Sequence, residues 1–266
     1  MTTAVATPPR HFGPASAVRH GTVLAWRGVL KIRKNPEQLL DVTLQPILFL
    51  VLFGYLFGGA VAGNTGAYLE TLAPGLMVQV ILMASMATGV ALNTDVSKGV
   101  FDRFRSMPIA RSAPLLGAVL ADVVRYVVAL VVLLLMAMVM GFRLHASPAG
   151  LVVAVAVLVL AGLCFCWITV FVGMLVPTPA SLQGVMVALM LPLTFGSNVF
   201  VPNATMPGWL RAWSEISPVS LLSDATRGLL VGGEVAGPLT GGLVWMAGVA
   251  VVFFPLAMRA YRRRMG

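Results

Sequence analysis

The side chains of this chain that could do chemistry are few and scattered. Its 266 residues include three histidines, two cysteines and nine acidic residues, whereas an enzyme embedded in a membrane needs such groups clustered in a wet cavity. His145 is the only histidine outside the N-terminal segment. Cys164 and Cys166 are two residues apart, so on a helix they point to different faces, and two thiols are too few ligands for a metal site. The pattern disfavours an embedded enzyme and predicts no metal site and no catalytic residue.

Nucleotide hydrolysis is not expected of this chain either. A phosphate-binding loop has the pattern G-x-x-x-x-G-K-[ST], in which the lysine follows a glycine. The three lysines are Lys31, Lys34 and Lys98, and none of them follows a glycine. If ATP powers this protein, the nucleotide and its magnesium are therefore expected on a partner chain, with no cofactor in this one.

A cytoplasmic loop, residues 93–112, carries the most distinctive charged pattern. Asn93, Thr94 or Asp95 can begin a helix, and Pro108 limits its end. The loop's two phenylalanines are three residues apart and share a helix face, surrounded by charges, which favours a docking element for another protein. The alternative is an ordinary basic loop that only sets topology. The candidate docking residues are Lys98, Val100, Phe101, Asp102, Arg103, Phe104, Arg105 and Met107.

Asp122 and Arg125 place opposite charges inside an apolar run. A charge at the centre of a bilayer costs about 2.5–3.5 kcal/mol, so each one needs a reason. The two residues are three apart on the expected helix, close to its cytoplasmic end. A local ion pair is the favoured interpretation; a relay from the docking loop into the membrane helices is the alternative.

The elements that position these residues are six long apolar segments. Hydrophobic residues make up 59% of the chain and charged residues 10%, which a soluble domain of this length could not tolerate. About 20 helical residues cross the hydrocarbon core, and continuously apolar runs argue against a barrel. The sequence therefore predicts an all-α integral membrane protein, whose membrane domain covers residues 37–258. The expected spans are 42–62, 72–92, 115–140, 150–176, 181–201 and 238–258, with a hairpin at Pro177-Thr178-Pro179 between the fourth and fifth.

The distribution of basic residues predicts the orientation. Fourteen of the eighteen Lys and Arg residues fall before the first span, in the second loop or in the basic tail 259–266. The positive-inside rule places these segments, and both termini, in the cytoplasm. Residues 1–16 are expected to be a flexible tail. Residues 17–36 have the basic and apolar faces of an interfacial helix, or form an ordinary positive tail that fixes topology.

Two further patterns concern packing and the outer surface. Gly54 and Gly58 have a spacing that permits close helix approach, between two chains or within one. The loop from 202 to 237 has Trp, Arg–Glu and Asp–Arg pairs at helical spacing, which predicts short helices at the outer interface. Whether they gate or merely cap the outer side stays open.

Polar and adaptable side chains within the spans are candidates for a translocation path. On the second span, Gln79, Met83 and Met86 share one stripe, and methionine adapts to varied ligand shapes. Packed or lipid-facing positions would account for the same residues equally well. The candidate path residues are Gln45, Phe49, Phe53, Gln79, Met83, Met86, Gln183 and Thr194.

Several segments resemble the daunorubicin/doxorubicin-resistance permeases of the ABC-2 family, whose fold is that of type V exporters. The main ones are KGVFDRFRSMPIARSAPL at 98–115 followed by ADVVR at 121–125, LDVTLQPILF at 40–49 and LPLTFGSNVFVP at 191–202. MPGWL at 206–210, SPVS at 217–220 and DATRGL at 224–229 look like the family's outer loop. Together they cover roughly residues 20 to 260 in the family's order. Many relatives have paired glutamates before Gly-Thr in the docking loop, where this chain has Ser97-Lys98-Gly99-Val100.

The resemblance implies a bacterial inner-membrane permease with both termini inside. It implies six membrane helices, an interfacial N-terminal helix, and a loop helix that couples to an ATPase. Two ATPase subunits and a second permease chain, most simply a copy of this one, would complete the exporter. The partners would be these subunits, membrane lipids and hydrophobic or amphipathic drugs or natural products, with no nucleic acid. Export of a lipid or glycolipid is an alternative, and an ion-coupled carrier is a weaker one because five of the spans lack charges.

Overall fold

The computed structural model describes residues 37–98 and 113–265, which are almost entirely helical and contain no strand. The predicted tail 1–16, interfacial helix 17–36 and most of the docking loop lie outside these residues. Within them the all-helical class is confirmed. The elements are α2 (Glu37–Ala62), α3 (Thr65–Ser97), α5 (Ala113–Val139), α6 (Pro148–Leu175), α7 (Pro179–Phe195), the 3₁₀ turn η1 (Asn203–Thr205), α8 (Gly208–Ile216), α9 (Pro218–Leu230) and α10 (Ala236–Met265).

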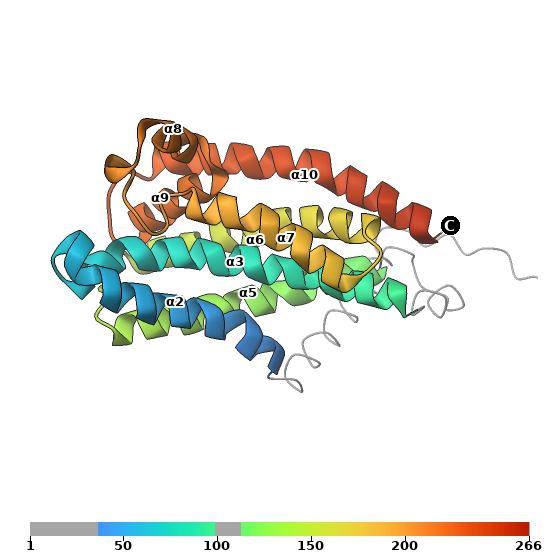
Figure 1. Ribbon diagram of the computed structural model, residues 1–266, viewed down its shortest axis with the longest axis horizontal. Helices are drawn as coiled ribbons and strands as arrows, with labels where there is room; N and C mark the ends of the chain where they lie inside the picture. The colour runs from blue at the N-terminus through green and yellow to red at the C-terminus, as the bar shows by residue number, and fades with distance from the viewer. Residues whose placement is uncertain (1–36, 99–112, 266) are drawn as a thin grey trace, which may run out of the picture.

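Of the described elements, the six longest helices are α2, α3, α5, α6, α7 and α10. They lie side by side along the longest axis of the molecule (Figure 1). By length and composition, four of them contain a stretch able to cross a membrane: Thr65–Ser97, Asp122–Val139, Pro148–Leu175 and Ala236–Arg264. The apolar part of α2, Leu44–Ala60, and α7 are shorter. With 17 residues, α7 spans about 25 Å, less than a typical hydrocarbon core of about 30 Å. Six crossings therefore remain a prediction.

The fifth expected span differs from the helix that the structure shows. The span was expected to cover 181–201, but α7 ends at Phe195 and residues 196–200 form turns and bends. Pro192 lies inside α7, and the Gly196 N–H closes the helix on the carbonyl of Pro192. Beyond this cap, the backbone of Val199 lies against α3 at Gly75. An apolar run thus turns back into the protein instead of continuing through lipid.

The two ends of the bundle have different character. Helix α2 runs towards the end that carries α8 and α9, whereas α3 and α10 run away from it and finish at the opposite end (Figure 1). The final turn of α10 carries Arg262, Arg263 and Arg264. This arrangement agrees with an even number of crossings; the cytoplasmic placement of the basic end remains a prediction.

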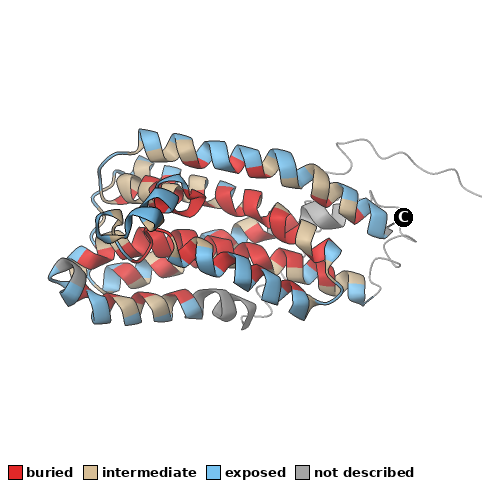
Figure 2. Ribbon diagram, turned by 45° about the horizontal axis from the view of Figure 1, so that its top comes forward, coloured by how far each residue is buried: buried red, intermediate tan, exposed pale blue. Residues whose placement is uncertain are grey.

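Helix α3 forms the centre of the bundle. Of its most apolar eighteen residues, 78% are buried, against 22% for α10. It packs against α2, α5, α6, α7 and α9, and Figure 2 shows buried residues concentrated along the inner helices. The outward faces of α2, α7 and α10 expose large apolar side chains, as expected of surfaces in contact with lipid. The remaining helices are thus arranged around α3.

Glycines allow α3 and α6 to approach each other closely. A Cβ atom on Gly89 would lie 2.6 Å from the Thr169 carbonyl oxygen, and one on Gly173 would lie 3.1 Å from the Gly89 carbonyl oxygen. The Thr169 hydroxyl donates to the Ser85 carbonyl across the same contact, at 2.9 Å. Small residues at such contacts are the usual means of helix packing in lipid.

Gly54 and Gly58 also pack within the chain. A Cβ atom on Gly58 would lie 2.7 Å from the Cα atom of Thr65 at the start of α3. One on Gly54 would lie 3.0 Å from the terminal methyl of Met140. Of the two alternatives left by the sequence, the structure therefore supports packing within one chain.

We predict that Gly89→Ala lowers the free energy of unfolding by about 1–3 kcal/mol, because the new methyl group must push α3 away from the α6 backbone. Thermal unfolding of the purified protein in detergent measures this. The matched control is Gly248→Ala in α10, where a Cβ atom meets nothing within 4 Å. The control should be neutral or stabilise by up to about 1 kcal/mol through helix propensity. Equal unfolding temperatures for the two variants would contradict the tight contact.

Candidate functional site

The candidate path residues fall into three environments. Gln79, Met86 and Thr194 are buried in the bundle. Phe49, Phe53 and Met83 are partly buried, and Gln45 and Gln183 are exposed on α2 and α7. One chain therefore does not enclose all eight residues in a single interior lining.

Two of the buried path residues carry polar atoms without partners. Among the described residues, neither the Gln79 Oε1 atom nor the Thr194 Oγ1 atom has a hydrogen-bond partner. Such an atom in an apolar interior costs about 1–3 kcal/mol. A bound water or a polar group of a substrate would remove that cost.

Phenylalanines connect α2 with the segment after α7. The Phe53 ring lies between its neighbours on α2, with centroid distances of 5.6 Å to Phe49 and 5.4 Å to Phe57. It also lies 4.8 Å from the ring of Phe200, which stacks on Phe195 at 5.0 Å. This cluster joins two of the predicted path residues to a segment that the sequence did not connect with them.

Asp122 and Arg125 form an ion pair on α5, at 2.9 Å between Oδ1 and Nη1. The Asp122 side chain is 3% exposed and that of Arg125 13%. The second carboxylate oxygen, Oδ2, has no hydrogen-bond partner in the described part of the chain. The geometry agrees with the local pair; the alternative role as a relay remains a prediction.

Of the candidate docking residues, only Lys98 lies within the described residues. It is exposed and caps the C-terminus of α3, where its N–H donates to the Thr94 carbonyl. The other seven, Val100, Phe101, Asp102, Arg103, Phe104, Arg105 and Met107, lie outside the described residues.

The expected helix start at residues 93–95 is wrong, because α3 continues unbroken through Ser97. The polar side chains there bond within α3 or to α6 instead of capping a new helix. The Thr94 hydroxyl donates to the Val90 carbonyl. Asn93 is fully buried and donates to two carbonyls at the end of α6. The sequence interpretation missed this role for Asn93.

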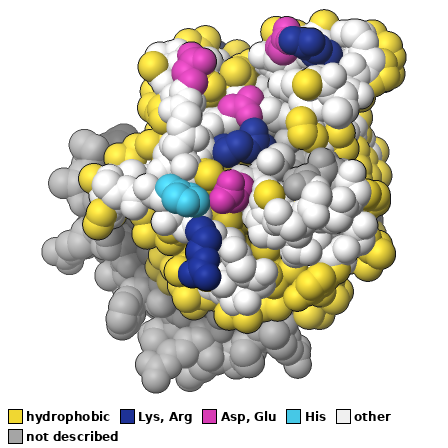
Figure 3. All heavy atoms as spheres, turned by 90° about the vertical axis from the view of Figure 1, so that its left-hand side faces the viewer, with side chains coloured by type: hydrophobic (Ala, Val, Ile, Leu, Met, Phe, Trp, Pro, Cys, Tyr) yellow, Lys and Arg dark blue, Asp and Glu magenta, His cyan; other side chains and the backbone are white. Residues whose placement is uncertain are grey.

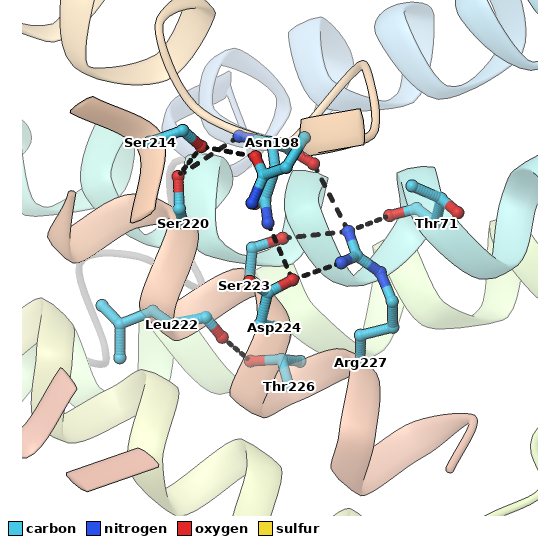
Figure 4. Close-up of polar contacts among 10 residues, drawn as sticks. Thr71, Asn198, Ser214, Ser220, Leu222, Ser223, Asp224, Thr226 and Arg227 are labelled. Carbon is cyan, nitrogen blue, oxygen red and sulfur yellow. Dashed lines mark hydrogen bonds and ion pairs between the residues drawn. The ribbon is translucent and has the colours of Figure 1, made fainter. Parts of the chain in front are cut away.

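At the opposite end of the bundle, a polar network joins α9 to α3 and to the segment after α7 (Figure 4). Arg227 forms an ion pair with Asp224. Its Nη2 atom also donates to the Thr71 carbonyl at 3.2 Å and to the Asn198 carbonyl at 3.4 Å. The Asn198 side chain donates to the same Asp224 carboxylate at 2.7 Å. One ion pair on α9 thereby holds three segments together.

A proline lies next to the α3 end of this network. Pro74 lies inside α3 and has no N–H, so the Glu70 carbonyl, four residues earlier, lacks its helical donor. Arg227 donates to the neighbouring carbonyl, that of Thr71. Nearby, the hydroxyls of Ser214 and Ser220 bond to each other at 2.8 Å, linking α8 to α9. The Asp–Arg spacing predicted the pair; nothing in the sequence pattern connected it with Asn198 or the serines.

The electrostatics of this end depend on that pair. Burial lowers the pKa of the Arg227 guanidinium, and the Asp224 carboxylate opposes the shift. The second predicted pair, Arg211 and Glu215, also forms, at 2.9 Å, but both side chains are more than half exposed. Figure 3 shows acidic and basic side chains distributed together over this end. No group of three or more His, Cys, Asp or Glu residues in the described ranges could hold a metal ion.

Fold and polar groups together define a multi-pass helical membrane protein with buried polar side chains near both ends of its bundle. The sequence pattern of the ABC-2 type transporter family matches residues 20–231. The chain therefore belongs to the ABC-2 type transporter family.

Relatives agree with this assignment. The chain is 41% identical over 252 residues to the daunorubicin resistance ABC transporter permease protein DrrB1 of Streptomyces coeruleorubidus, covering 94% of this chain and 88% of the relative. It is 29% identical over 222 residues to a Mycobacterium tuberculosis protein named "Probable doxorubicin resistance ABC transporter permease protein DrrC", covering 82% and 79%. It is 33% identical over 162 residues to the doxorubicin resistance ABC transporter permease protein DrrB of the same organism, covering 56% and 51%.

We predict that Asp224→Ala destabilises the protein by about 1–3 kcal/mol, because it leaves the largely buried Arg227 guanidinium without its carboxylate. Thermal unfolding in detergent measures the loss. The matched control, Glu215→Ala, removes the carboxylate of an exposed pair and should change stability by less than about 1 kcal/mol. If the two substitutions cost the same, the outer network does not hold α9 as described.

Proposed function

We propose that this chain is the membrane subunit of an ATP-driven exporter for hydrophobic or amphipathic drugs, powered by a separate ATPase. The observation that carries the proposal is 41% identity to a daunorubicin resistance permease over 94% of this chain. The relatives are named as daunorubicin or doxorubicin resistance permeases. Their similarity to this chain supports the same drug class and the same role here.

The sequence indicates that ATP is hydrolysed by a partner chain and not by this one. None of the three lysines follows a glycine, so a phosphate-binding loop of the usual pattern is missing from these 266 residues. The energy of ATP must then enter from a partner chain. The proposed docking element is the loop between α3 and α5, with Phe101 and Phe104 as its apolar anchors and two ATPase copies in the complete transporter.

A second permease chain, most simply a copy of this one, is part of the proposal. Gln45 on α2 and Gln183 on α7 are exposed on largely apolar helices. An amide facing hydrocarbon leaves its hydrogen bonds unmade. A second chain against these helices, or a wet path between two chains, would relieve that cost.

The proposed path through the membrane includes the buried polar groups of α3 and α7. Gln79 and Thr194 each carry an atom without a partner among the residues described. If they line a path, their polarity serves the substrate; if they only pack, their polarity is a cost. A role in the path predicts that apolar replacements of similar size alter drug transport, whereas a role in packing predicts that they leave it unchanged.

We predict that Gln79→Met and Thr194→Val leave stability unchanged or higher, because the unsatisfied polar atom is removed, while altering drug transport. Unfolding temperature and the concentration dependence of doxorubicin uptake by inside-out vesicles are measured together. The control is Leu189→Met, a replacement of similar size on the exposed face of α7. Wild-type transport at every drug concentration by both buried variants would remove Gln79 and Thr194 from the path.

We predict that the double variant Phe101→Ala, Phe104→Ala, co-expressed with the ATPase, inserts normally but loses both ATPase co-purification and ATP-dependent doxorubicin efflux. The two rings are the largest apolar groups of the loop, so their removal should take most of the docking energy. The control, Phe254→Ala, removes an exposed ring on α10 and should retain both. Full efflux from the double variant would refute docking through these rings. If an added lipid reduces doxorubicin efflux by competition, that result would favour the lipid as the cargo.

A further inference from the structure

The corner between α6 and α7 leaves backbone carbonyls without helical donors. A helical carbonyl accepts from the N–H four residues later. For Gly173 and Leu175 those positions are Pro177 and Pro179, which have no N–H. Val176 has already left the helix, with φ −86° and ψ 148°. An unpaired carbonyl in an apolar interior costs about 1–3 kcal/mol, so donors from elsewhere are expected here.

Asn93 of α3 supplies these donors. Its Nδ2 atom lies 2.6 Å from the Gly173 carbonyl oxygen and 3.0 Å from that of Val176. The residue is fully buried, so water does not compete for these bonds. From α10, the Arg264 guanidinium reaches the same Val176 carbonyl at 3.3 Å. One buried amide thus satisfies two carbonyls of the corner.

The contact extends along a single face of α3. Ser85, Gly89 and Asn93 are four residues apart, so they occupy successive turns of one face. Ser85 accepts from the Thr169 hydroxyl, and Gly89 lies against the α6 backbone. The cytoplasmic half of α3 and the last turns of α6 are therefore bonded along their length, with Asn93 at the end of the row.

Beyond Asn93, α3 leads directly towards the proposed docking loop. The helix continues through Ser97, whose hydroxyl donates back to the Asn93 carbonyl at 2.8 Å. The first residue outside α3 is Lys98, its cap. The α6–α7 corner, in turn, leads into α7, which carries Thr194. Figure 1 shows the C-terminal end of α3 and the α6–α7 connection at the same end of the bundle.

We propose that Asn93 is the residue through which a displacement of the loop after α3 moves the α6–α7 corner, and with it α7. The proposal rests on the proposed function, because it takes an ATPase to displace the loop. Asn93 is a positioning residue that contacts neither nucleotide nor the drug. Its two hydrogen bonds join the end of α3 to the α6–α7 corner without passing through the centre of the membrane.

A purely structural role for Asn93 predicts a different outcome. If the amide only stabilises the fold, its loss lowers the amount of folded protein, and transport falls in proportion to ATP hydrolysis. If it couples the loop to α7, hydrolysis continues while transport fails. The informative quantity is therefore the amount of drug moved per ATP hydrolysed.

The first experiment compares Asn93→Leu, which removes both donors at similar volume, with wild type co-expressed with the ATPase. We expect ATPase co-purification within about twofold of wild type. In inside-out vesicles we expect ATP hydrolysis within about twofold of wild type, but the amount of doxorubicin moved per ATP reduced about tenfold. Asn93→Ser, which keeps one donor, should lie between the two. The control, Thr88→Val, removes a buried hydroxyl that has no partner in the described part of the chain and should keep the wild-type ratio. An unchanged ratio in Asn93→Leu would overturn the proposal.

The second experiment needs no ATPase and no drug, so it tests whether Asn93 holds the end of α3 against the α6–α7 corner even if the exporter proposal fails. Nitroxide labels at Ala91→Cys on α3 and Ala180→Cys on α7 occupy exposed positions, whereas the native Cys164 and Cys166 are buried. We expect a narrow distance distribution in the otherwise wild-type chain and a distinctly broader one with Asn93→Leu. Equal widths would show that the Asn93 hydrogen bonds do not hold the two segments together. Absence of doxorubicin transport by the wild type would instead count against the proposed function alone.

Discussion

Inside a bilayer, every backbone N–H and C=O must find its partner within the protein, and this requirement governs the distinctive features of the fold. Prolines interrupt the helical hydrogen bonds at Pro74 in α3 and again at the α6–α7 corner. A polar side chain from another helix lies at each place. Arg227 donates to the Thr71 carbonyl, next to the one that Pro74 leaves without a donor, and Asn93 donates to the Gly173 carbonyl, which Pro177 leaves without one. Two of the side chains that join distant segments therefore lie beside prolines that disturb the backbone.

The second consequence of the lipid environment is the dominance of close packing. Without a strong hydrophobic effect between helices, association depends on van der Waals contact and hydrogen bonds. Gly89 allows the α3 backbone to touch α6, and Gly75 allows it to touch the segment after α7. Because α3 is buried on nearly all sides, a movement of its C-terminal end must be shared with the helices packed against it. Helix α3 is therefore the route we propose from the proposed docking loop to the membrane interior.

The sequence predicted the parts of the structure that depend on composition and spacing. The apolar runs predicted the six long helices, Pro177 and Pro179 predicted the hairpin, and the charge spacing on α9 predicted the Asp–Arg pair. It failed where tertiary contacts override local pattern. Asn93 had the character of a helix cap but became a buried donor, and the apolar run after Phe195 turned inward instead of continuing the helix. Single-sequence periodicity cannot reveal a hydrogen bond between residues 80 or more apart.

The central claim is that this chain is a conduit that cannot pump by itself. The most direct measurement is ATP-dependent doxorubicin accumulation in inside-out vesicles that contain the permease chain alone, the ATPase alone, or both. The account predicts accumulation only when both are present, and its loss when the ATPase is inactivated by mutation. Accumulation by the permease chain alone, or none when both chains are inserted and associated, would contradict it.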